Sequence, residues 1–585
     1  MSIENKLVSL TINGMPLSVP VNTTILEAAH QANIHIPTLC FLKEKNEIGA
    51  CRICVVEIKG ARNLVASCVY PVSDGMEIFT NSEKVRRSRK MTLELILSNH
   101  DRKCLSCVRS GQCELQTLCQ EYGIVDESVY DGAREEFKED ESTKWLVRDN
   151  NKCILCRRCV SVCQAQNVSV IGANNRGFDT YIGCAFNKDL GDSPCIGCGQ
   201  CIVVCPTGAL REKDDTDKVW EVLSDPTKHV IVQTAPSIRT TLGEDFGMPI
   251  GTNVKGKMVT ALQNLGFDKV FDTDFGADLT IMEEATEFID RYTNSGKLPL
   301  ITSCSPGWVN FCENFYPDMI DNLSSCKSPQ QMTGAMIKTW YAEQNNIDPN
   351  DIVCVSIMPC TAKKFEVTRP DQSASGYSDV DIVLTTRELA RMIKRSHLDF
   401  VNLPDSDFDP AMGLSTGAGA IFGITGGVME AALRTAADWL TGEDLKEIEY
   451  KQIRGTESIK EAEYTIAGNK FKIAVVSGTK AASEILDRVK AGEHFDFIEV
   501  MACPGGCING GGQPKQQSDV LNYVDLKALR GGALYSEDEK LTFRKSHQSP
   551  LIKQAYDEFL GKPGGHKAHE LLHTTYKARG SRLSK

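Results

Sequence analysis

The sequence has no apolar run long enough to span a membrane, and it does not open with a charged stretch followed by an apolar one. We therefore expect neither a membrane protein nor a secreted one, but a cytoplasmic protein. Positive charge is also scarce: the formal net charge is −12 at pH 7, which argues against nucleic acid as a general partner. The glycine-rich stretch at 413–427 matches neither G-x-G-x-x-G nor G-x-x-x-x-G-K-[ST], so no nucleotide site is expected on this chain.

Cysteine, in contrast, is abundant. The chain has 24 cysteines in 585 residues, and 17 of them lie in tight groups before residue 206. Because the cytoplasm keeps thiols reduced, metal ligation explains so many cysteines better than disulfides do. The length and an apolar content of 41% leave room for several domains with real cores. We expect a front part dense in metal and a back part with few metal ligands.

Residues 1–80 have the element order of a β-grasp [2Fe–2S] ferredoxin. Apolar and polar residues alternate over 8–19 around Asn13-Gly14, which predicts a hairpin, and a helical pattern opened by a threonine cap follows at 23–32. Two irons need four thiolates, and this segment supplies four, although their spacing is wider than the plant-type C-x4-C-x2-C. The four are Cys40, Cys51, Cys54 and Cys68.

Residues 81–140 hold a second group of ligand-type side chains, a histidine followed by three cysteines. They are His100, Cys104, Cys107 and Cys113. A lone histidine is usually an ordinary surface or core residue, but here it completes a set of four ligands. Zinc would fit the same set, whereas the neighbouring cluster loops favour a [4Fe–4S] cluster. Cys119 is left over and is expected to be an ordinary buried thiol.

Residues 141–215 contain a repeat typical of bacterial ferredoxins with two [4Fe–4S] clusters. The spacing C-x2-C-x2-C-x3-C occurs twice, and in such ferredoxins the fourth cysteine of each run binds the other cluster. One cluster is therefore predicted to take Cys153, Cys156, Cys159 and Cys205. The other is predicted to take Cys163, Cys195, Cys198 and Cys201. Cys184 has no assigned place, and the four clusters of the front part are expected to form a wire in series.

Over residues 216–585 apolar runs alternate with helical stretches, which favours an α/β domain with mainly parallel strands. Cysteine loops directly follow three predicted strands, at Cys304, at Cys360, and at Cys503 with Cys507. Because sites in open α/β sheets gather beyond the carboxyl ends of strands, these cysteines are expected to meet. The glycines around the last pair would let the backbone approach a bulky group. The whole chain is predicted to be an α/β multidomain protein.

Three segments of this last part closely resemble the signature segments of [FeFe]-hydrogenase catalytic domains. They read TSCSPGW at 302–308, MPCTAKKFE at 358–366 and EVMACPGGCINGGGQP at 499–514. The resemblance extends through the order of the front clusters, and within the family it is nearest to the catalytic subunits of NADP-reducing hydrogenases. It implies an H-cluster domain over 216–585. An H-cluster is a [4Fe–4S] cubane linked through one cysteine sulfur to a two-iron unit that carries CO, cyanide and a bridging azadithiolate.

The resemblance also implies roles for single residues. Cys360, Cys503 and Cys507 match cubane ligands, with Cys507 as the bridge to the two-iron unit. The residues that match the lining of the two-iron unit are Pro236, Ser237, Gln330, Met358, Lys363 and Met501. Of these, Lys363 and Ser237 would offer donors to a cyanide, and the methionines would give a soft, dry lining.

One position departs from the family pattern. The family usually reads TSCCP, in which the first cysteine passes protons and the second binds the cubane, whereas this chain has Ser305 in the second place. Either Ser305 is an oxygen ligand, or Cys304 is recruited and the proton route changes. A thiolate is the better iron ligand, but neighbouring side chains do not point alike. The sequence leaves both possibilities open.

The family's proton relay, carried over to this chain, would run from Cys304 through Glu284, Ser324, Glu287 and Arg291. The two glutamates and the arginine lie at helical spacing on one face of a predicted helix. A surface charge ladder would have the same spacing. Since buried carboxylates with a pKa near neutrality suit proton passage, the resemblance favours the relay.

The function implied is that of an [FeFe]-hydrogenase: reversible oxidation of H2 to protons and electrons, with the electrons carried by the accessory clusters. Reduction of NADP would need flavin- and NADP-binding partner subunits in a hetero-oligomer, and ferredoxin is the other possible acceptor. The alternative is a non-catalytic relative, a hydrogenase-like H2 sensor or an Fe–S biogenesis protein. Ser305 weakly favours it, whereas the presence of Cys507, Lys363, Met358 and Met501 argues against it. The large Fe–S subunit of respiratory complex I shares the front half but would lack the three rear segments.

The segment HELLH at 569–573 fits the H-E-x-x-H pattern of zinc proteases. Little chain follows it that could supply a third ligand, and related hydrogenases carry similar tails. A zinc site is therefore not expected there.

Overall fold

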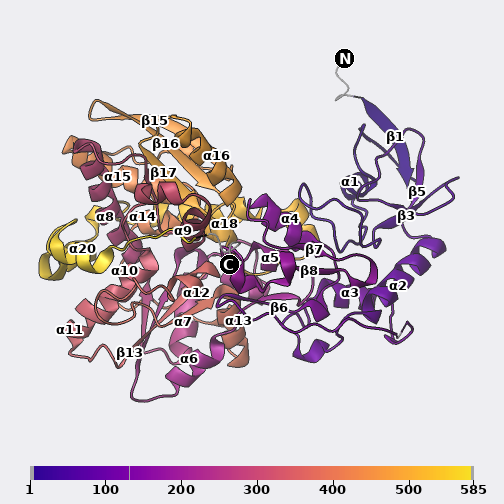
Figure 1. Ribbon diagram of the computed structural model, residues 1–585, viewed down its shortest axis with the longest axis horizontal. Coiled ribbons are helices and arrows are strands. Elements are labelled where there is room, and N and C mark those ends of the chain that lie inside the picture. Colours follow the sequence, from indigo (N-terminus) through magenta and orange to yellow (C-terminus); the bar gives the residue numbers. More distant parts are fainter. Residues whose placement is uncertain (1–5, 131, 581–585) are drawn as a thin grey trace.

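The computed structural model describes residues 6–130 and 132–580 (Figure 1). Its first unit is a five-stranded mixed sheet with the order β2-β1-β5-β3-β4 and a short helix. The elements are β1 (Leu7–Ile12), β2 (Met15–Pro20), α1 (Ile25–Gln31), β3 (Val55–Ile58), β4 (Val65–Ala66) and β5 (Glu77–Phe79). Apolar side chains from the sheet and from α1 form one small core.

The predicted hairpin and helix of this unit are both present. The hairpin turn consists of Asn13 and Gly14, whose φ angles are 52° and 81°, the conformation that suits the twist of two antiparallel strands. Thr24 caps α1, because its hydroxyl accepts a hydrogen bond from the backbone N–H of Glu27. The Glu27 carboxylate in turn accepts one from the backbone N–H of Thr24, which completes a capping box.

Short elements between this unit and the C-terminal part carry the remaining front cysteines. Two helices come first, α2 (Glu83–Ser98) and α3 (Glu114–Glu121), and the helices α4 (Arg158–Ala165) and α5 (Gln200–Val203) pack on each other. Two small antiparallel ladders complete the region: β6 (Leu146–Arg148) with β9 (Leu210–Glu212), and β7 (Gly172–Asn174) with β8 (Tyr181–Gly183). In Figure 1, α4, α5, β7 and β8 lie between the N-terminal sheet and the large C-terminal part, while α2 and α3 lie below the sheet.

The C-terminal part contains two four-stranded sheets. The order of the first is β11-β10-β13-β14, and all of its strands are parallel. The order of the second is β12-β17-β16-β15, which is parallel except for its edge strand β15. The strands are β10 (His229–Thr234), β11 (Lys269–Asp272), β12 (Leu300–Ile301), β13 (Ile352–Met358), β14 (Ile382–Thr385), β15 (Ile459–Ile466), β16 (Asn469–Ser477) and β17 (Phe497–Met501).

Helix α8 (Asp274–Thr293) joins the cores of the two sheets. Its side chains Phe275 and Leu279 belong to the core around the first sheet, while Ile281 and Phe288 belong to a core on one face of the second. The helix packs against α10 (Pro329–Met336) and α15 (Gly427–Thr441). Because α8 is apolar on both sides over much of its length, it is buried between the sheets rather than laid on the surface.

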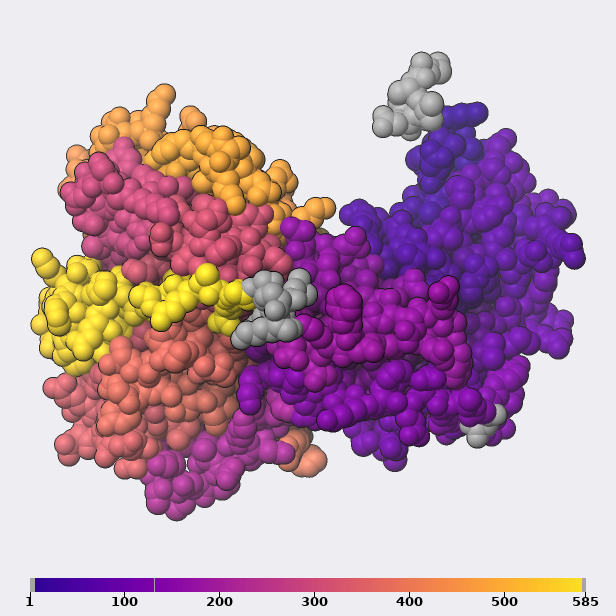
Figure 2. Space-filling view, in the orientation of Figure 1, coloured from indigo at the N-terminus to yellow at the C-terminus, as the bar shows by residue number. Residues whose placement is uncertain are grey.

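The last part of the chain reaches back to earlier elements. In α17 (Ser518–Tyr523) the Asn522 side chain accepts a hydrogen bond of 2.9 Å from the backbone N–H of Lys43 in the N-terminal unit. Beyond α20 (His566–Leu572), His573 pairs with Cys326 in an isolated antiparallel bridge. In Figure 2 the C-terminal segment, in yellow, crosses the face of the molecule between two bulky regions.

The predicted α/β multidomain architecture with mainly parallel sheets in the C-terminal part is confirmed. Within the described ranges, every helix is too short or too polar to traverse a bilayer. The domain boundaries after residues 80, 140 and 215 remain predictions. The first falls between β5 and α2, the second before β6, and the third immediately before α6 (Thr216–Leu223).

Candidate active site

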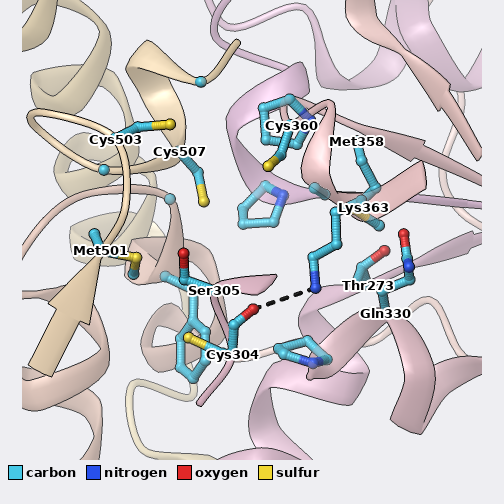
Figure 3. Close-up of a pocket in the computed structure, with 18 of the residues that line it drawn as sticks. Thr273, Cys304, Ser305, Gln330, Met358, Cys360, Lys363, Met501, Cys503 and Cys507 are labelled. Carbon is cyan, nitrogen blue, oxygen red and sulfur yellow. Dashed lines mark hydrogen bonds between the residues drawn. The ribbon is translucent and has the colours of Figure 1, made fainter. Parts of the chain in front are cut away.

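A cavity is lined by residues that follow the carboxyl ends of strands from both large sheets (Figure 3). Pro236 follows β10 and Cys360 follows β13, while Cys304 follows β12 and Cys503 follows β17. The cavity has a volume of about 80 Å³, several times what one water molecule needs, so it can hold a group of many atoms. Parallel strands direct their following loops to one edge, which explains why distant segments meet here.

Three cysteine sulfurs point toward a common space in this cavity. Figure 3 shows them on Cys360, Cys503 and Cys507, which come from two different sheets. Burial raises the pKa of each thiol, and the Cys360 thiol adds to the shift at the other two. Three thiolates this close would repel one another unless a cation lay between them. The donor set therefore fits a positively charged metal cluster.

The neighbours Cys304 and Ser305 point in different directions. Ser305 Oγ accepts a hydrogen bond of 3.2 Å from the backbone N–H of Ala502, and Figure 3 shows this hydroxyl on the side of the cavity that holds the Cys507 sulfur. The Cys304 sulfur lies on the opposite side of the Cys304–Ser305 backbone from the Ser305 hydroxyl. Burial and then the Glu284 carboxyl raise the pKa of Cys304, so this thiol lies beside the predicted relay.

Glycine allows the loop after β17 to pack against two other loops. A Cβ on Gly510 would lie 2.3 Å from the carbonyl oxygen of Pro359, and one on Gly511 would lie 2.2 Å from the carbonyl oxygen of Cys198. Neither distance leaves room for a side chain. The glycines therefore hold this loop against the loop of β13 on one side and against a cysteine loop of the front half on the other.

Lys363 and Gln330 are polar groups in an otherwise largely apolar lining. Lys363 Nζ donates to the carbonyl oxygen of Cys304 at 3.2 Å and to the two carboxylate oxygens of Glu366 at 3.2 and 3.0 Å. Gln330 Nε2 donates to Glu366 at 3.0 Å, and its Oε1 is buried with no partner among the described residues. An unpaired buried acceptor costs free energy, so this oxygen fits a cavity that holds a bound group.

Five of the six lining residues predicted from the resemblance do line the cavity. They are Pro236, Gln330, Met358, Lys363 and Met501. Ser237 is fully buried but is not part of the lining. Its hydroxyl oxygen instead accepts a hydrogen bond of 3.3 Å from Gln513 Nε2. Ser237 directly follows Pro236 in the short turn after β10, and at this next position the side chain points away from the cavity.

Other lining residues were missed by the sequence reasoning. They include Thr273, Ala277, Pro329, Phe422 and Gly423. Phe422 and Gly423 belong to the glycine-rich stretch at 413–427, which matched no known motif. Thr273 and Ala277 lie four residues apart at the start of α8. A pair of small side chains at helical spacing is too common in sequences to indicate a site.

The five predicted relay residues lie close together between the cavity and the surface. Ser324 Oγ donates to Glu287 Oε2 at 3.0 Å, and Arg291 donates to Glu287 Oε1 at 2.5 Å. Burial raises the pKa of Glu284 to about 8, and neither of its oxygens accepts a hydrogen bond of ordinary geometry. Glu284 is therefore protonated near neutral pH and adjoins the Cys304 thiol, whereas Arg291 is only partly buried.

Two smaller cavities lie among the ferredoxin-type cysteines. One is lined by Cys153, Cys156, Cys159 and Cys205. The other is lined by Cys163, Cys195, Cys198 and Cys201. In each cavity one cysteine comes from the other run of the repeat, the arrangement that the spacing predicts. Cys184, which had no predicted role, is buried and lines neither cavity.

The four cysteines of the N-terminal unit form two close pairs. The sulfurs of Cys54 and Cys68 are 3.3 Å apart, and the Cys40 sulfur accepts a contact of 3.5 Å from the backbone N–H of Cys51. Hydrogen bonding with the Cys40 thiol lowers the pKa of Cys51 to about 6. Sulfurs that share protons in this way are placed to exchange them for metal ions.

His100 is buried, and its Nδ1 has no partner among the described residues. Burial lowers the pKa of this ring to about 4, so it is neutral, the form in which histidine binds a metal. Cys113 is buried, and Cys104 and Cys107 are partly exposed. Cys119, expected to be a buried thiol, is also partly exposed, and burial raises its pKa to about 12.

Contacts among the cysteine loops form a fork, in which both front segments reach the ferredoxin-type loops directly, although Leu39 and Ile53 of the N-terminal unit also share one apolar core with Cys113. Asn46 Nδ2 donates both to the carbonyl oxygen of Cys40, at 2.6 Å, and to that of Cys156, at 3.0 Å. The Cys113 sulfur lies 3.7 Å from the carbonyl oxygen of Pro206. The N-terminal unit and the His100 segment thus both adjoin the cavity of Cys153, Cys156, Cys159 and Cys205, although chain order predicted a series.

The second ferredoxin-type cavity adjoins the active site. The Cys503 sulfur lies 3.8 Å from the carbonyl oxygen of Cys198, and Thr361 Oγ1 donates to the carbonyl oxygen of Gly197 at 2.6 Å. These contacts join the ferredoxin-type loop of Gly197 and Cys198 to the loops after β13 and β17, which carry the active-site cysteines.

The two histidines of HELLH lie side by side, and His573 has hydrogen-bond partners at both ring nitrogens. His573 Nε2 hydrogen-bonds Glu283 at 2.9 Å, and its Nδ1 hydrogen-bonds Ser325 at 2.8 Å. The His569 ring stacks on the His573 ring with centroids 4.5 Å apart. Both nitrogens of His573 are therefore already engaged.

Family models match successive parts of the chain. Residues 5–83 match a 2Fe-2S iron-sulfur cluster binding domain, 89–128 match the NADH-ubiquinone oxidoreductase-G iron-sulfur binding region, and 152–216 match a 4Fe-4S dicluster domain. Residues 228–511 match the C-terminal domain of the iron only hydrogenase large subunit, and 524–579 match the iron hydrogenase small subunit. The metal-binding domains thus occupy the front of the chain and the hydrogenase domains the back.

Similar proteins cover nearly the whole chain. NADP-reducing hydrogenase subunit HndD of Solidesulfovibrio fructosivorans is 50% identical over 98% of this chain and 99% of its own. Iron hydrogenase 1 of Clostridium pasteurianum is 46% identical over 97% of this chain and all of its own. The solved structure of a variant of [FeFe]-hydrogenase HydA1 from Chlamydomonas reinhardtii matches with a TM-score of 0.55 and 40% identity, covering 62% of this chain and 98% of that one.

Proposed function

Because the chain belongs to the [FeFe]-hydrogenase family, we propose that it catalyses the reversible oxidation of H2 to protons and electrons. The observation that carries this proposal is the convergence of three cysteine sulfurs from different sheets on one largely apolar cavity. A cavity of this kind at strand ends suits a large metal cofactor, since it offers soft ligands and excludes water.

The cofactor would be an H-cluster. Its cubane would be held by Cys360, Cys503 and Cys507, with Cys507 as the bridge to the two-iron unit. We assign the fourth position to Ser305 Oγ rather than to Cys304, because this hydroxyl lies on the side of the Cys507 sulfur. When bound, such a centre supplies the making and breaking of the H–H bond.

The other lining residues would orient that group and keep water out. Lys363 Nζ, which lies between Cys304 and Glu366, could redirect one of its three N–H groups from these partners into the cavity. Pro236, Met358 and Met501 provide apolar contact. In a site without water, one positioned ammonium group stabilises negative charge far better than it would in solvent.

Protons would move between the cavity and the surface through the relay. Cys304 would exchange a proton with Glu284, and Ser324 would connect Glu284 with Glu287. Glu287 is hydrogen-bonded both to Ser324 and to the partly exposed Arg291, so it lies at the outer end. Because burial raises the pKa of Glu284 to about 8, this carboxyl can bind and release a proton at small cost near neutral pH.

Electrons would move through one [2Fe–2S] cluster and three [4Fe–4S] clusters. The [2Fe–2S] ligands would be Cys40, Cys51, Cys54 and Cys68. The [4Fe–4S] ligand sets would be His100 with Cys104, Cys107 and Cys113; Cys153, Cys156 and Cys159 with Cys205; and Cys195, Cys198 and Cys201 with Cys163. The fork of contacts supports two entry branches that join before the active site.

The electron acceptor would lie on another protein. The relative from Solidesulfovibrio fructosivorans is named a subunit of an NADP-reducing hydrogenase, which supports flavin- and NADP-binding partner subunits in a hetero-oligomer. Ferredoxin would be the other acceptor. The surface near the N-terminal unit would be the docking point, and the assembly would act in the cytoplasm, with domains divided as predicted after residues 80, 140 and 215.

The test is an H2 uptake assay on anaerobically matured protein with a viologen dye as acceptor. We expect H2-dependent dye reduction, together with infrared bands of CO and cyanide bound to iron. Cys507→Ala should abolish both, since it removes a ligand of the centre, while Cys312→Ala should retain both because Cys312 is a core thiol away from the cavity. Fully matured, iron-replete protein without these bands or without H2 uptake would refute the proposal.

A further inference from the structure

Beside the outer end of the relay lies a second hydrogen-bonded group that includes His573 from the C-terminal segment. Ser325 Oγ and His573 Nδ1 are 2.8 Å apart, and His573 Nε2 and Glu283 Oε2 are 2.9 Å apart. The His573 side chain is only 5% exposed, and its backbone is held by the bridge to Cys326. The imidazole is therefore fixed in position within reach of the relay.

The surroundings of Glu283 decide which nitrogen of His573 carries a permanent hydrogen. Glu283 is buried, and it accepts hydrogen bonds from the Tyr556 hydroxyl and, at 2.9 Å, from the backbone N–H of Gly564. Both of its oxygens therefore already act as acceptors, Oε1 for Tyr556 and Oε2 for Gly564. His573 Nε2 must then carry hydrogen and donate to it, which leaves Nδ1 as the nitrogen that can gain or lose a proton.

Ser325 connects Nδ1 to the relay. Its hydroxyl oxygen lies 2.8 Å from His573 Nδ1 and 3.2 Å from Glu287 Oε2. A hydroxyl has one hydrogen and cannot donate it to two acceptors at once. Two arrangements use both contacts. In one, Glu287 is protonated and donates to Ser325, which donates to Nδ1; in the other, Nδ1 is protonated and donates to Ser325, which donates to the Glu287 carboxylate. The two arrangements differ by the transfer of one proton.

We propose that His573 stores a proton at the outer end of the relay and exchanges it with Glu287 through the Ser325 hydroxyl. In the forward step the Glu287 carboxyl gives its proton to Ser325 Oγ while Ser325 gives its own to Nδ1. The products are a Glu287 carboxylate, an unchanged serine hydroxyl and an imidazolium, so atoms and charge balance. This role rests on the proposed function, because it extends the route by which protons would reach the cavity.

Charged groups adjoin both ends of the exchange. Arg291 pairs with Glu287 at 2.5 Å, and Glu283 lies 2.9 Å from His573 Nε2. The remaining titratable groups nearby are Glu284, Cys326, Tyr556 and the exposed, stacked His569. Of these only His569 could carry an opposing positive charge, and its exposure to solvent screens that charge.

The test compares His573→Gln with two other variants. Ser325→Ala removes the bridging hydroxyl but keeps His573 in place, and His569→Gln is the matched control, since His569 touches His573 only by stacking. At about pH 8, where protons are scarce, we expect the first two variants to produce H2 about threefold to tenfold more slowly than wild type. Near about pH 6 the difference should shrink to about twofold or less, while His569→Gln should match wild type at both pH values.

Infrared spectroscopy of the imidazole ring separates a stored proton from a merely structural role. Wild type should show a ring band of an imidazolium that shifts in D2O. The band should be absent from His573→Gln and retained in His569→Gln. The same imidazolium band in wild type and in His573→Gln, or an equal loss of rate at both pH values, would overturn the proposal. The band does not depend on turnover, so a wild-type protein inactive with H2 would refute the proposed function without deciding this one.

Discussion

At the scale of single residues, the adjacent side chains Cys304 and Ser305 divide two roles between them. The Ser305 hydroxyl lies on the side of the Cys507 sulfur, whereas the Cys304 thiol adjoins Glu284. Ser305 stands at the N-terminus of α9 (Pro306–Phe315) with φ −99° and ψ 101°, and this extended backbone turns the two side chains apart. A serine at a ligand position thus does not require Cys304 to leave the relay.

Replacement of Ser305 by cysteine tests this assignment. A thiolate is softer than a serine oxygen and binds iron better, so in Ser305→Cys we expect the cubane to form more completely and its reduction potential to change. Ser305→Ala should leave one iron without a protein ligand. Mössbauer spectra of protein that carries only the cubane would report both effects.

In wild type these spectra should show one iron distinct from the other three. Identical spectra for wild type, Ser305→Cys and Ser305→Ala would contradict ligation by Ser305, and a change produced only by Cys304→Ala would assign the ligand to the other neighbour.

Glu284 should affect both activity and the pH dependence of stability. Burial raises the pKa of Glu284 from 4.5 to about 8, so between these pH values the folded protein holds a proton that the unfolded chain has released. Wild type therefore loses stability as the pH rises through this window, whereas Glu284→Gln does not. We expect the melting temperature of Glu284→Gln, relative to that of wild type, to increase as the pH rises toward about 8. H2 turnover in this variant should be lowered roughly a hundredfold to ten-thousandfold.

Glu287→Gln provides the comparison for stability, because Glu287 is paired with Arg291. It should be less active but should gain no such stability at high pH. Equal melting temperatures of wild type and Glu284→Gln across the window would show that Glu284 is ionised, contrary to the relay.

Motif spacing predicted at this scale which cysteines meet, but not how neighbouring side chains are directed. The crossed sets that include Cys163 and Cys205 follow from spacing alone, since the repeat dictates them. The contacts of Ser237 with Gln513 and of His573 with Ser325 depend on backbone turns and on segments far away in the chain. No local pattern encodes such contacts.

At the scale of elements, the glycine loop after β17 is the joint between the front half and the active site. Gly511→Ala would place a Cβ 2.2 Å from the carbonyl oxygen of Cys198, and both atoms belong to backbone that cannot easily move. We expect a loss of about 1–3 kcal/mol in stability. Electron transfer from the cluster of Cys198 to the active site should also slow, since the two loops must separate.

The matched control for this change is Gly532→Ala. Gly532 lies within α18 (Leu526–Lys540), and a Cβ there would meet nothing within 4 Å. It should raise stability by about 1 kcal/mol, because alanine favours a helix. Apparent melting temperatures and the rate of cluster reduction under H2 would measure both variants, and equal behaviour of the two would contradict the close packing of the loop.

Most elements near the site were predictable because their local patterns agree with their burial. Strands β13 and β17 are mostly apolar, with Ser356 and Glu499 as their polar residues, and they are buried as a central parallel strand must be. The strand before Cys304 was also predicted, but β12 has only two residues. It pairs with β17 alone among the strands, so its length depends on a neighbour that local sequence does not reveal.

At the scale of the whole molecule, spatial order differs from chain order. The sequence suggested four clusters in series, but the N-terminal unit and the His100 segment both contact the same ferredoxin-type loops. The contact through Asn46 joins residues 110 positions apart. Patterns within a segment predict each cluster, while the connection between clusters depends on how separate units pack.

A fork predicts that one branch works without the other. Cys107→Ser should remove the cluster held with His100, yet H2 should still reduce the [2Fe–2S] cluster at about the wild-type rate, since Asn46 joins that branch directly to Cys156. Freeze-quenched samples measured by electron paramagnetic resonance would follow this reduction. Cys156→Ser, at the junction, should block it. A slow [2Fe–2S] reduction in Cys107→Ser would instead support a series.

The account depends most on one claim, that thiolates from both large sheets hold a single iron centre in the cavity of Figure 3. Anomalous X-ray diffraction at the iron edge, on crystals of anaerobically matured protein, tests it directly. The account predicts one continuous site of six irons bounded by Cys360, Cys503, Cys507 and Ser305. Matured protein with no iron in this cavity, or with four irons and no two-iron unit beside Cys507, would contradict it.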